Sequence, residues 1–196
     1  MKFTILLMIF SVSITFALGQ TKITDFKPGQ KAMITRGSHD SWLVMNNSRE
    51  VAFLSPHSGT VNLYSIDLNK LNFVKSNQKG LLLAEYIGYE TYTEKYLPLT
   101  DFTEGGIDSP EYSPNGELVI FRRYVEDTTK SKEEMTFLLP YKYSIMIVNT
   151  QTKSLGTLVS EKVSAMTFLS DSTVLFQQEE KDSNWLKMVN IRTKEM

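Results

Sequence analysis

The sequence predicts an all-β fold assembled from repeated four-stranded antiparallel units. Short runs of residues alternate apolar and polar side chains, which is the period of a β-strand, and helical periodicity is nearly absent. Turn-forming clusters separate these runs, among them 56–59, 113–116 and 181–184. A recurrent spacing between a phenylalanine and a polar residue further indicates that the strands form repeats.

The composition is that of a folded and weakly charged protein. The 196 residues are 41% hydrophobic and 11% aromatic, and the formal net charge is −1. Such a chain buries enough surface to offset its conformational entropy, so it is not disordered. The lack of a basic excess argues against a nucleic-acid partner. The absence of cysteine excludes a disulfide scaffold, a thiolate zinc site and a cysteine nucleophile.

Residues 1–19 are typical of a signal peptide and are not expected to belong to the fold. A short positive segment precedes a largely apolar run over 3–16, and small residues precede a cleavage site ahead of Gln20. The apolar run is shorter than the ~20 residues that span a bilayer, and no basic cluster follows it. We therefore expect a mature domain over 20–196, without a membrane span, that is secreted or periplasmic.

Three segments of the chain share one order of strands: an inner strand, a polar turn, a strand ending in phenylalanine, and a strand ending in Asp or Asn. The three pairs of residues that end these strands are Phe53 and Asp67, Phe121 and Asn149, and Phe176 and Asn190. The first and third pairs are each 14 residues apart, and the second is 28 apart, which is the same spacing plus an insertion of 14. Arbitrary hairpins rarely produce such agreement.

Each repeat continues into a further strand, which we place at 71–75 in the first unit and at 154–159 in the second. Over 143–148 both alternating faces are mostly apolar, as expected for a strand between two neighbouring sheets. Recurring four-stranded antiparallel units form the blades of a β-propeller. The predicted blades span approximately 41–75, 107–159 and 163–196.

One stretch, IDSPEYSPNGELVIFRR over 107–123, resembles the repeat of TolB-like, WD-like six-bladed propellers. That family places Ser-Pro-Asp-Gly between a strand that ends in an aromatic residue and a strand that ends in Phe. Tyr112 matches the aromatic position, and the segment 97–100 is similar to the outer strand that precedes the motif. The matching turn and strand-end residues are Ser113, Pro114, Asn115, Gly116 and Phe121.

The resemblance extends over roughly 27–192 and is close only over 97–123, where Asn115 replaces the usual Asp. The motif is expected to be structural. Asn115 and Gly116 supply a positive-φ turn, and Pro114 fixes φ at its entry. These residues build blades and carry no chemistry.

Three blades are fewer than a closed propeller needs. An outer strand near 31–35 is a candidate to complete the last blade, which otherwise stops after its third strand at 190–191. We therefore expect an incomplete propeller, either a truncated or split gene product or a module completed by a partner. Self-association is one way of completing it.

Motifs for catalysis or cofactor binding are absent from the sequence, including Gly-x-Ser-x-Gly and the glycine-rich phosphate loops. His39 and His57 fall in loops expected on opposite rims, so we predict no shared metal site and no cofactor. Asp108 and Glu111 enter the inner strand of the second blade. They either bind a cation in a central channel, as in calcium-dependent lactonase propellers, or form a polar cap at the strand entrance.

Two insertions are candidates for binding. The first carries four tyrosines, a residue enriched where proteins bind ligands or each other, and the alternative is that they pack on a neighbouring blade. These residues are Tyr86, Tyr89, Tyr92 and Tyr96. The second insertion, 124–140, mixes charges before an apolar end and is typical of a rim loop, where propellers place binding functions.

The leading functional hypothesis is an exported, non-enzymatic propeller module that binds a protein, peptide or glycan through its rim loops. The alternative is a fragment of a propeller-containing enzyme, either a metal-dependent lactonase-like protein or the propeller of a prolyl-oligopeptidase-type peptidase. A third hypothesis is structural, an incomplete propeller that closes by pairing with another chain. The sequence does not decide among them, because one fold hosts many functions.

Overall fold

The computed structural model of the chain describes residues 20–27, 31–34, 40–75, 81–85, 96–128, 141–160, 162–180 and 183–196. Four predictions from the sequence fall outside these residues. They are the signal peptide over 1–19, the loop residue His39, the tyrosines Tyr86, Tyr89 and Tyr92, and the greater part of the 124–140 insertion.

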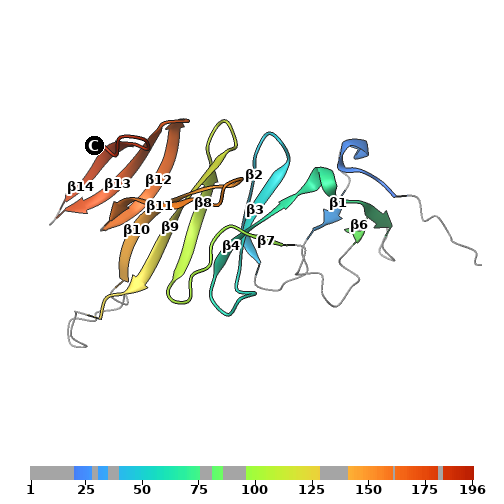
Figure 1. The fold of residues 1–196 in the computed structure, drawn as a ribbon, viewed down its shortest axis with the longest axis horizontal. Helices are drawn as coiled ribbons and strands as arrows, with labels where there is room; N and C mark the ends of the chain where they lie inside the picture. Colours follow the sequence, from blue (N-terminus) through green and yellow to red (C-terminus); the bar gives the residue numbers. More distant parts are fainter. Residues whose placement is uncertain are drawn as a thin grey trace, which may run out of the picture.

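The described residues form four sheets, which the core contacts place side by side in a row (Figure 1). The first sheet contains β1 (Lys31–Met33), β6 (Leu81–Ala84) and β5 (Phe73–Lys75). The second contains β2 (Ser41–Met45), β3 (Glu50–Ser55), β4 (Asn62–Asp67) and β7 (Leu97–Pro98). The third contains β11 (Leu155–Ser160), β10 (Tyr141–Asn149), β9 (Leu118–Glu126) and β8 (Gly106–Tyr112). The fourth contains β12 (Val163–Ser170), β13 (Thr173–Glu180) and β14 (Ser183–Asn190). Two short 3-10 turns are η1 (Ile23–Asp25) and η2 (Leu68–Lys70).

Alternate residues of the central strands pack against the sheets on either side. Val51 and Phe53 of β3 belong to a buried cluster shared with the first sheet, whereas Ala52 and Leu54 belong to one shared with the third sheet. Because successive side chains of a strand point to opposite faces, a strand covered on both sides must be apolar throughout. All four of these side chains are buried.

The third sheet repeats this arrangement. Phe121 and Val148 pack toward the second sheet, while Ile120 and Ile145 pack toward the fourth sheet. The expectation that both faces of 143–148 are apolar is thereby confirmed, and so is the all-β fold class. The four sheets are blades of a partial β-propeller, and sheet-on-sheet burial is its core.

The pairing of 71–75 differs from the prediction. This segment contains β5, which does not extend the second sheet but pairs antiparallel with β6. Phe73 is fully buried, meets Phe26 edge-to-face with ring centroids 4.9 Å apart, and exchanges two backbone hydrogen bonds with Thr21. This ring is buried in a cluster with side chains of β3 and β4. Strand β5 therefore belongs to the first sheet, which packs on the second, and does not lie at the edge of β4.

Two further strands have partners that the sequence did not identify. The strand predicted near 31–35 is β1, and it pairs parallel with β6, so its proposed place in the last blade is wrong. The segment 97–100 contains β7, which pairs with β4 at Ser65 and Leu97 and is the outer strand of the second sheet. Its similarity to the outer strand of the propeller motif is consistent with this position.

The β8–β9 turn has the structural role that the motif predicts. Gly116 has a φ of 77°, and its amide donates to the Ser113 carbonyl at 2.8 Å. Asn115 does not share the positive φ; its side-chain oxygen instead accepts from the Ser113 hydroxyl at 2.7 Å and from the Glu117 amide at 3.1 Å. The correction is small: glycine provides the left-handed residue and asparagine closes the loop.

Equivalent turns of neighbouring sheets are hydrogen-bonded to each other. Asn46, in the β2–β3 turn, donates through Nδ2 to the Gly116 carbonyl at 3.1 Å, and its Oδ1 accepts from the Glu50 amide. The Asn115 amide in turn donates to Oδ1 of Asp171, in the β12–β13 turn, at 2.8 Å. The first turns of three successive blades are thus joined in one chain of contacts.

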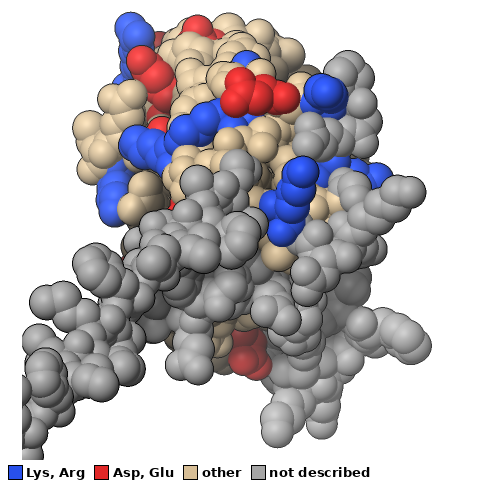
Figure 2. Space-filling view, turned by 90° about the vertical axis from the view of Figure 1, so that its right-hand side faces the viewer, with Lys and Arg blue, Asp and Glu red and all other residues tan. Residues whose placement is uncertain are grey.

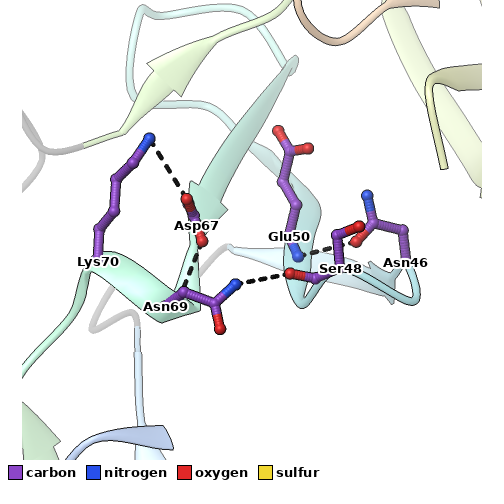
Figure 3. Close-up of polar contacts among 6 residues, drawn as sticks. All are labelled: Asn46, Ser48, Glu50, Asp67, Asn69 and Lys70. Atoms are coloured by element: carbon purple, nitrogen blue, oxygen red, sulfur yellow. Dashed lines mark hydrogen bonds and ion pairs between the residues drawn. The ribbon is translucent and has the colours of Figure 1, made fainter.

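Figure 3 shows how the Asn46 turn is joined to the end of β4. Asn69 of η2 donates to the Ser48 carbonyl at 2.7 Å, and Asp67 accepts from the Asn69 amide and pairs with Lys70.

The polar residue that defines the repeat spacing serves the same purpose in all three blades. Side-chain oxygens of Asp67, Asn149 and Asn190 each accept from a backbone amide two residues farther along the chain. The spacing recognised in the sequence therefore marks the residue that shapes the turn after the third strand of each unit.

We predict that Gly116→Ala lowers the free energy of unfolding by roughly 2–3 kcal/mol, measured by urea denaturation. The left-handed backbone disfavours alanine, and a Cβ here would lie 3.0 Å from Cβ and Nδ2 of Asn46.

Gly59→Ala is the matched control, because Gly59 has a φ of 91° but nothing within 4 Å of an added Cβ. It should lose only the backbone contribution, roughly 1–2 kcal/mol. Equal losses at both positions would show that the contact between the two turns contributes nothing.

Candidate functional site

The end of the stack formed by the first sheet carries charges of both signs. Figure 2 faces this end and shows basic and acidic side chains interspersed among uncharged ones over the described residues. A candidate site lies in a groove between two sheets.

Tyr96 is the one described member of the tyrosine-rich segment. Its side chain is buried, and its ring lies edge-to-face with Phe53 at a centroid distance of 4.8 Å and with Tyr64 at 5.9 Å. Its hydroxyl donates to the Asp40 carboxylate at 3.3 Å. The ring therefore packs against side chains of β3 and β4, and binding by the tyrosine-rich segment stays a prediction from the sequence.

Tyr96 also lines an open groove of about 690 Å³ between the second and third sheets. The groove is lined chiefly by aromatic and polar side chains. We call it the aromatic groove and define it by His57, Tyr64, Tyr96, Asp101, Phe102 and Lys153. Its volume lies within the range of ligand-binding pockets, roughly 300–1,000 Å³.

Three connections between strands position these side chains. His57 is exposed in the β3–β4 turn, with its ring centroid 6.3 Å from that of Tyr64 and 6.4 Å from that of Tyr96. Phe102 follows β7, and the Arg123 guanidinium lies 4.1 Å from its ring centroid. Lys153 comes from the β10–β11 turn of the next sheet. The groove consequently exists only where two sheets meet.

A single buried amide ties together two connections that form the second-sheet wall of the groove. Asn62 is fully buried; its Oδ1 accepts from the Phe102 amide at 2.7 Å and from the Thr100 hydroxyl at 2.8 Å. Its Nδ2 donates to the Phe102 carbonyl and to the Ser58 hydroxyl, each at 3.0 Å. These bonds hold the β3–β4 turn and the segment after β7 in fixed relation.

Sequence reasoning placed His57 in a loop without a metal site and did not single out Phe102, Asp101 or Lys153. Local patterns gave no signal for them, because their shared groove depends on how the second and third sheets are stacked. Within one hairpin, the fixed β3–β4 register is the only local indication that His57 and Tyr64 lie near each other.

Asp108 lies outside the groove and forms a bidentate ion pair. Both carboxylate oxygens accept from Arg122, at 2.8 Å each, and the other terminal nitrogen of Arg122 donates to the Ser164 carbonyl of β12 at 2.8 Å. The hydrogen bond with Asp108 raises the pKa of Arg122 above its ordinary value, although burial opposes this. The pair links the third sheet to the fourth.

Glu111 makes a separate link to the same sheet. Its Oε1 accepts from the Thr167 hydroxyl at 2.9 Å and from the Phe168 amide at 3.1 Å. The two carboxylates thus bind different protein donors. Sequence analysis offered a cation site or a polar cap at the strand entrance, and it did not foresee these contacts between sheets.

Tyr112, the aromatic residue of the motif, has a side-chain hydroxyl that is buried away from polar partners in the described part of the chain. Its hydroxyl is buried and has no hydrogen-bond partner among the described residues. Burial, reinforced by the nearby charge of Glu50, raises the pKa of this phenol far above its ordinary value. The hydroxyl is therefore neutral, and its ring contributes by packing.

Two further observations limit the chemistry of the described residues. No group of three or more His, Cys, Asp or Glu side chains is placed to hold a metal ion in this part of the chain. In the same residues, no helix has the length and apolarity required to cross a bilayer.

Comparison with known proteins yields matches only at the level of structure. No family model matches the sequence, and no curated protein matches it. Among solved structures, the chain is similar to an oligogalacturonate lyase from Vibrio parahaemolyticus, with 14% identity and a TM-score of 0.39, covering 72% of this chain and 46% of that protein.

Two other solved structures have similarly low sequence identity to the chain. An acylaminoacyl peptidase from Pyrococcus horikoshii has 11% identity and a TM-score of 0.41, covering 80% of this chain and 24% of that one. TolB from Acinetobacter baumannii has 12% identity and a TM-score of 0.27, covering 79% and 52%. The chain spans about half or less of each of these three proteins, and its fold is assigned from its own strand pairing.

We predict that Asn62→Ala lowers the free energy of unfolding by roughly 2–4 kcal/mol, because it leaves the Phe102 amide and carbonyl without their partner. Chemical denaturation measures this loss. Asn69→Ala removes an exposed amide that donates to the Ser48 carbonyl, and it should cost no more than about 1 kcal/mol. A loss at Asn62 no larger than that at Asn69 would contradict the role of the buried amide.

Tyr112→Phe is predicted to raise the free energy of unfolding, by up to about 1 kcal/mol, because it removes a buried hydroxyl that lacks a partner. The matched control is Tyr96→Phe, which deletes the hydrogen bond to Asp40 and should be destabilising. Thermal unfolding of both variants tests the opposite signs. Destabilisation by Tyr112→Phe would mean that this hydroxyl is satisfied in solution.

Proposed function

We propose that this chain is an exported, non-enzymatic β-propeller module that binds a peptide segment of another protein in the aromatic groove. The observation that carries the proposal is the juxtaposition of the more exposed rings of His57 and Phe102, from two connections, around one open groove whose lining also includes the buried rings of Tyr64 and Tyr96. Aromatic side chains supply large contact areas at low conformational cost and are enriched at recognition surfaces.

The charged residues of the groove favour a peptide over a neutral glycan. Asp101 and Lys153 are both exposed and lie on opposite walls, one from each sheet. A peptide offers apolar side chains for the rings together with groups of both charges for these two residues. A neutral glycan would offer these two residues hydroxyl groups as hydrogen-bond partners but no opposite charge.

The groove is supported in the way that a recognition site requires. Asn62 fixes two of its connections, and Arg123 stacks on Phe102, so the aromatic walls are held before any ligand binds. Preorganisation of this kind lowers the entropy lost on association.

The enzyme hypotheses stay predictions from the sequence. None of the contacts found for Asp108, Glu111 or His57 specifically favours a lactonase-like or a peptidase-associated role. Export, to the periplasm or the medium, is part of the proposal and rests on the signal-peptide pattern of residues 1–19.

The proposal is tested by selecting peptides from a displayed random library against the immobilised protein and measuring their affinity by fluorescence anisotropy. We predict that His57→Ala and the double variant Asp101→Asn, Lys153→Gln each weaken selected peptides at least 10-fold, which is about 1.4 kcal/mol. Both changes affect exposed side chains, so folding should be preserved.

Lys70→Ala serves as the control, because Lys70 is exposed and lies outside the groove. Its peptide affinity should equal that of the wild type. An oligosaccharide array run in parallel would overturn the peptide assignment if glycans bound through His57 and peptides did not.

A further inference from the structure

Strand β14 presents an apolar edge that no described strand covers. It is the terminal strand of the fourth sheet and pairs only with β13 among the described residues. Trp185, Leu186 and Met188 are 54%, 74% and 55% exposed. A sheet edge of this kind offers unpaired backbone groups as a template for another strand.

Hydrogen bonds at the end of β14 reveal which backbone groups face outward. The Ile191 amide donates inward to the Ser172 carbonyl at 3.0 Å. The preceding residue, Asn190, instead donates to the Glu195 carbonyl at 3.0 Å and accepts from the Lys194 amide at 2.8 Å, both on the side away from β13. With the two-residue period of a strand, the amides and carbonyls of Met188, Leu186 and Asn184 also point outward.

The same contacts define how much of the edge is open. The chain's own turn already occupies the outer side of Asn190, so the open part runs over residues 183–188. Because Val189 is buried against the third sheet, the even-numbered side chains lie on the opposite, outer face. There, Met188 is paired across the sheet with Leu175, and Leu186 with Gln177.

Charge, which usually protects an edge strand, is weak here. Natural edges are shielded by lysine, proline or bulges, but the outer-face residues Asn184, Leu186 and Met188 are uncharged. The one charged residue of the strand, Lys187, forms an ion pair with Glu180 of β13. The edge is therefore both apolar and nearly neutral.

We propose that β14 pairs antiparallel with β14 of a second copy, about a two-fold axis at Leu186. In this register Leu186 lies opposite Leu186 of the other copy, and Asn184 lies opposite Met188. All three residues direct their backbone groups outward, so each pair exchanges two hydrogen bonds. The two fourth sheets become one continuous sheet across the axis.

The edge suits a second copy because a two-fold axis pairs its apolar and polar residues with compatible residues of the same strand. A two-fold axis brings no like charges directly opposite each other, and it joins Leu175, Met188 and Leu186 of both copies into one apolar strip. On the other face, Trp185 lies opposite Lys187 of the second copy, a pairing suited to a cation–π contact. The proposal is independent of peptide binding, since the aromatic groove lies between the second and third sheets.

Sedimentation velocity and light scattering over a concentration series test the proposal on the purified mature chain. We expect a reversible dimer with twice the mass of the chain. Leu186→Lys places two ammonium groups opposite each other at the axis and should give a monomer. Leu186→Pro removes an outward amide that β13 does not use, and it should also give a monomer.

Leu169→Lys is the matched control, because Leu169 is 53% exposed in the same sheet but lies on β12, at the edge opposite to β14. This variant should remain dimeric, and circular dichroism should show native strand content in all three variants. A wild type that is monomeric at every concentration overturns the proposal. So does a dimer that survives both Leu186 changes, or one that only Leu169→Lys dissociates.

Discussion

Burial of each sheet by its neighbours is the constraint on which the rest of this structure depends. The central strands carry apolar residues on both faces, such as Phe53 and Leu54 on β3 and Phe121 and Ile120 on β9, and no single sheet can bury both. Adjacent sheets satisfy this requirement in turn along the row. The hydrogen bonds from Asn46 to Gly116 and from Asn115 to Asp171 join the turns of neighbouring sheets. Polar contacts therefore connect the same pairs of sheets that apolar packing connects.

Stacking also explains where polar groups gather. Asp108, through Arg122, and Glu111 both act across the gap between the third and fourth sheets, where donors of one sheet meet acceptors of the next. The aromatic groove occupies the gap between the second and third sheets, and the buried amide of Asn62 holds the wall formed by the second sheet. Both the polar contacts between blades and the aromatic groove therefore lie where two sheets meet.

Much of the fold could be predicted because its signals are local. Strand period, the turn at Ser113–Gly116 and the spacing that ends at Asp67, Asn149 and Asn190 depend on residues close together in the chain, and each has a direct structural counterpart. The candidate site could be predicted less completely from the sequence. Tyr96 was identified as a candidate, but its partner His57 was not, because their proximity requires the segment after residue 95 to return along β4.

The sequence by itself determined the all-β class, the repeat unit and the residues that form its turns, because hydrophobic period and turn chemistry act over a few positions. Only the tertiary structure decided which strand completes which sheet. Phe73 of β5 is buried in the core shared by the first and second sheets, where β5 pairs with β6, and the short β7 takes the edge of β4 instead. Strand partners are chosen by the burial of side chains distant in sequence, and that free energy depends on the assembled layers rather than on any local pattern.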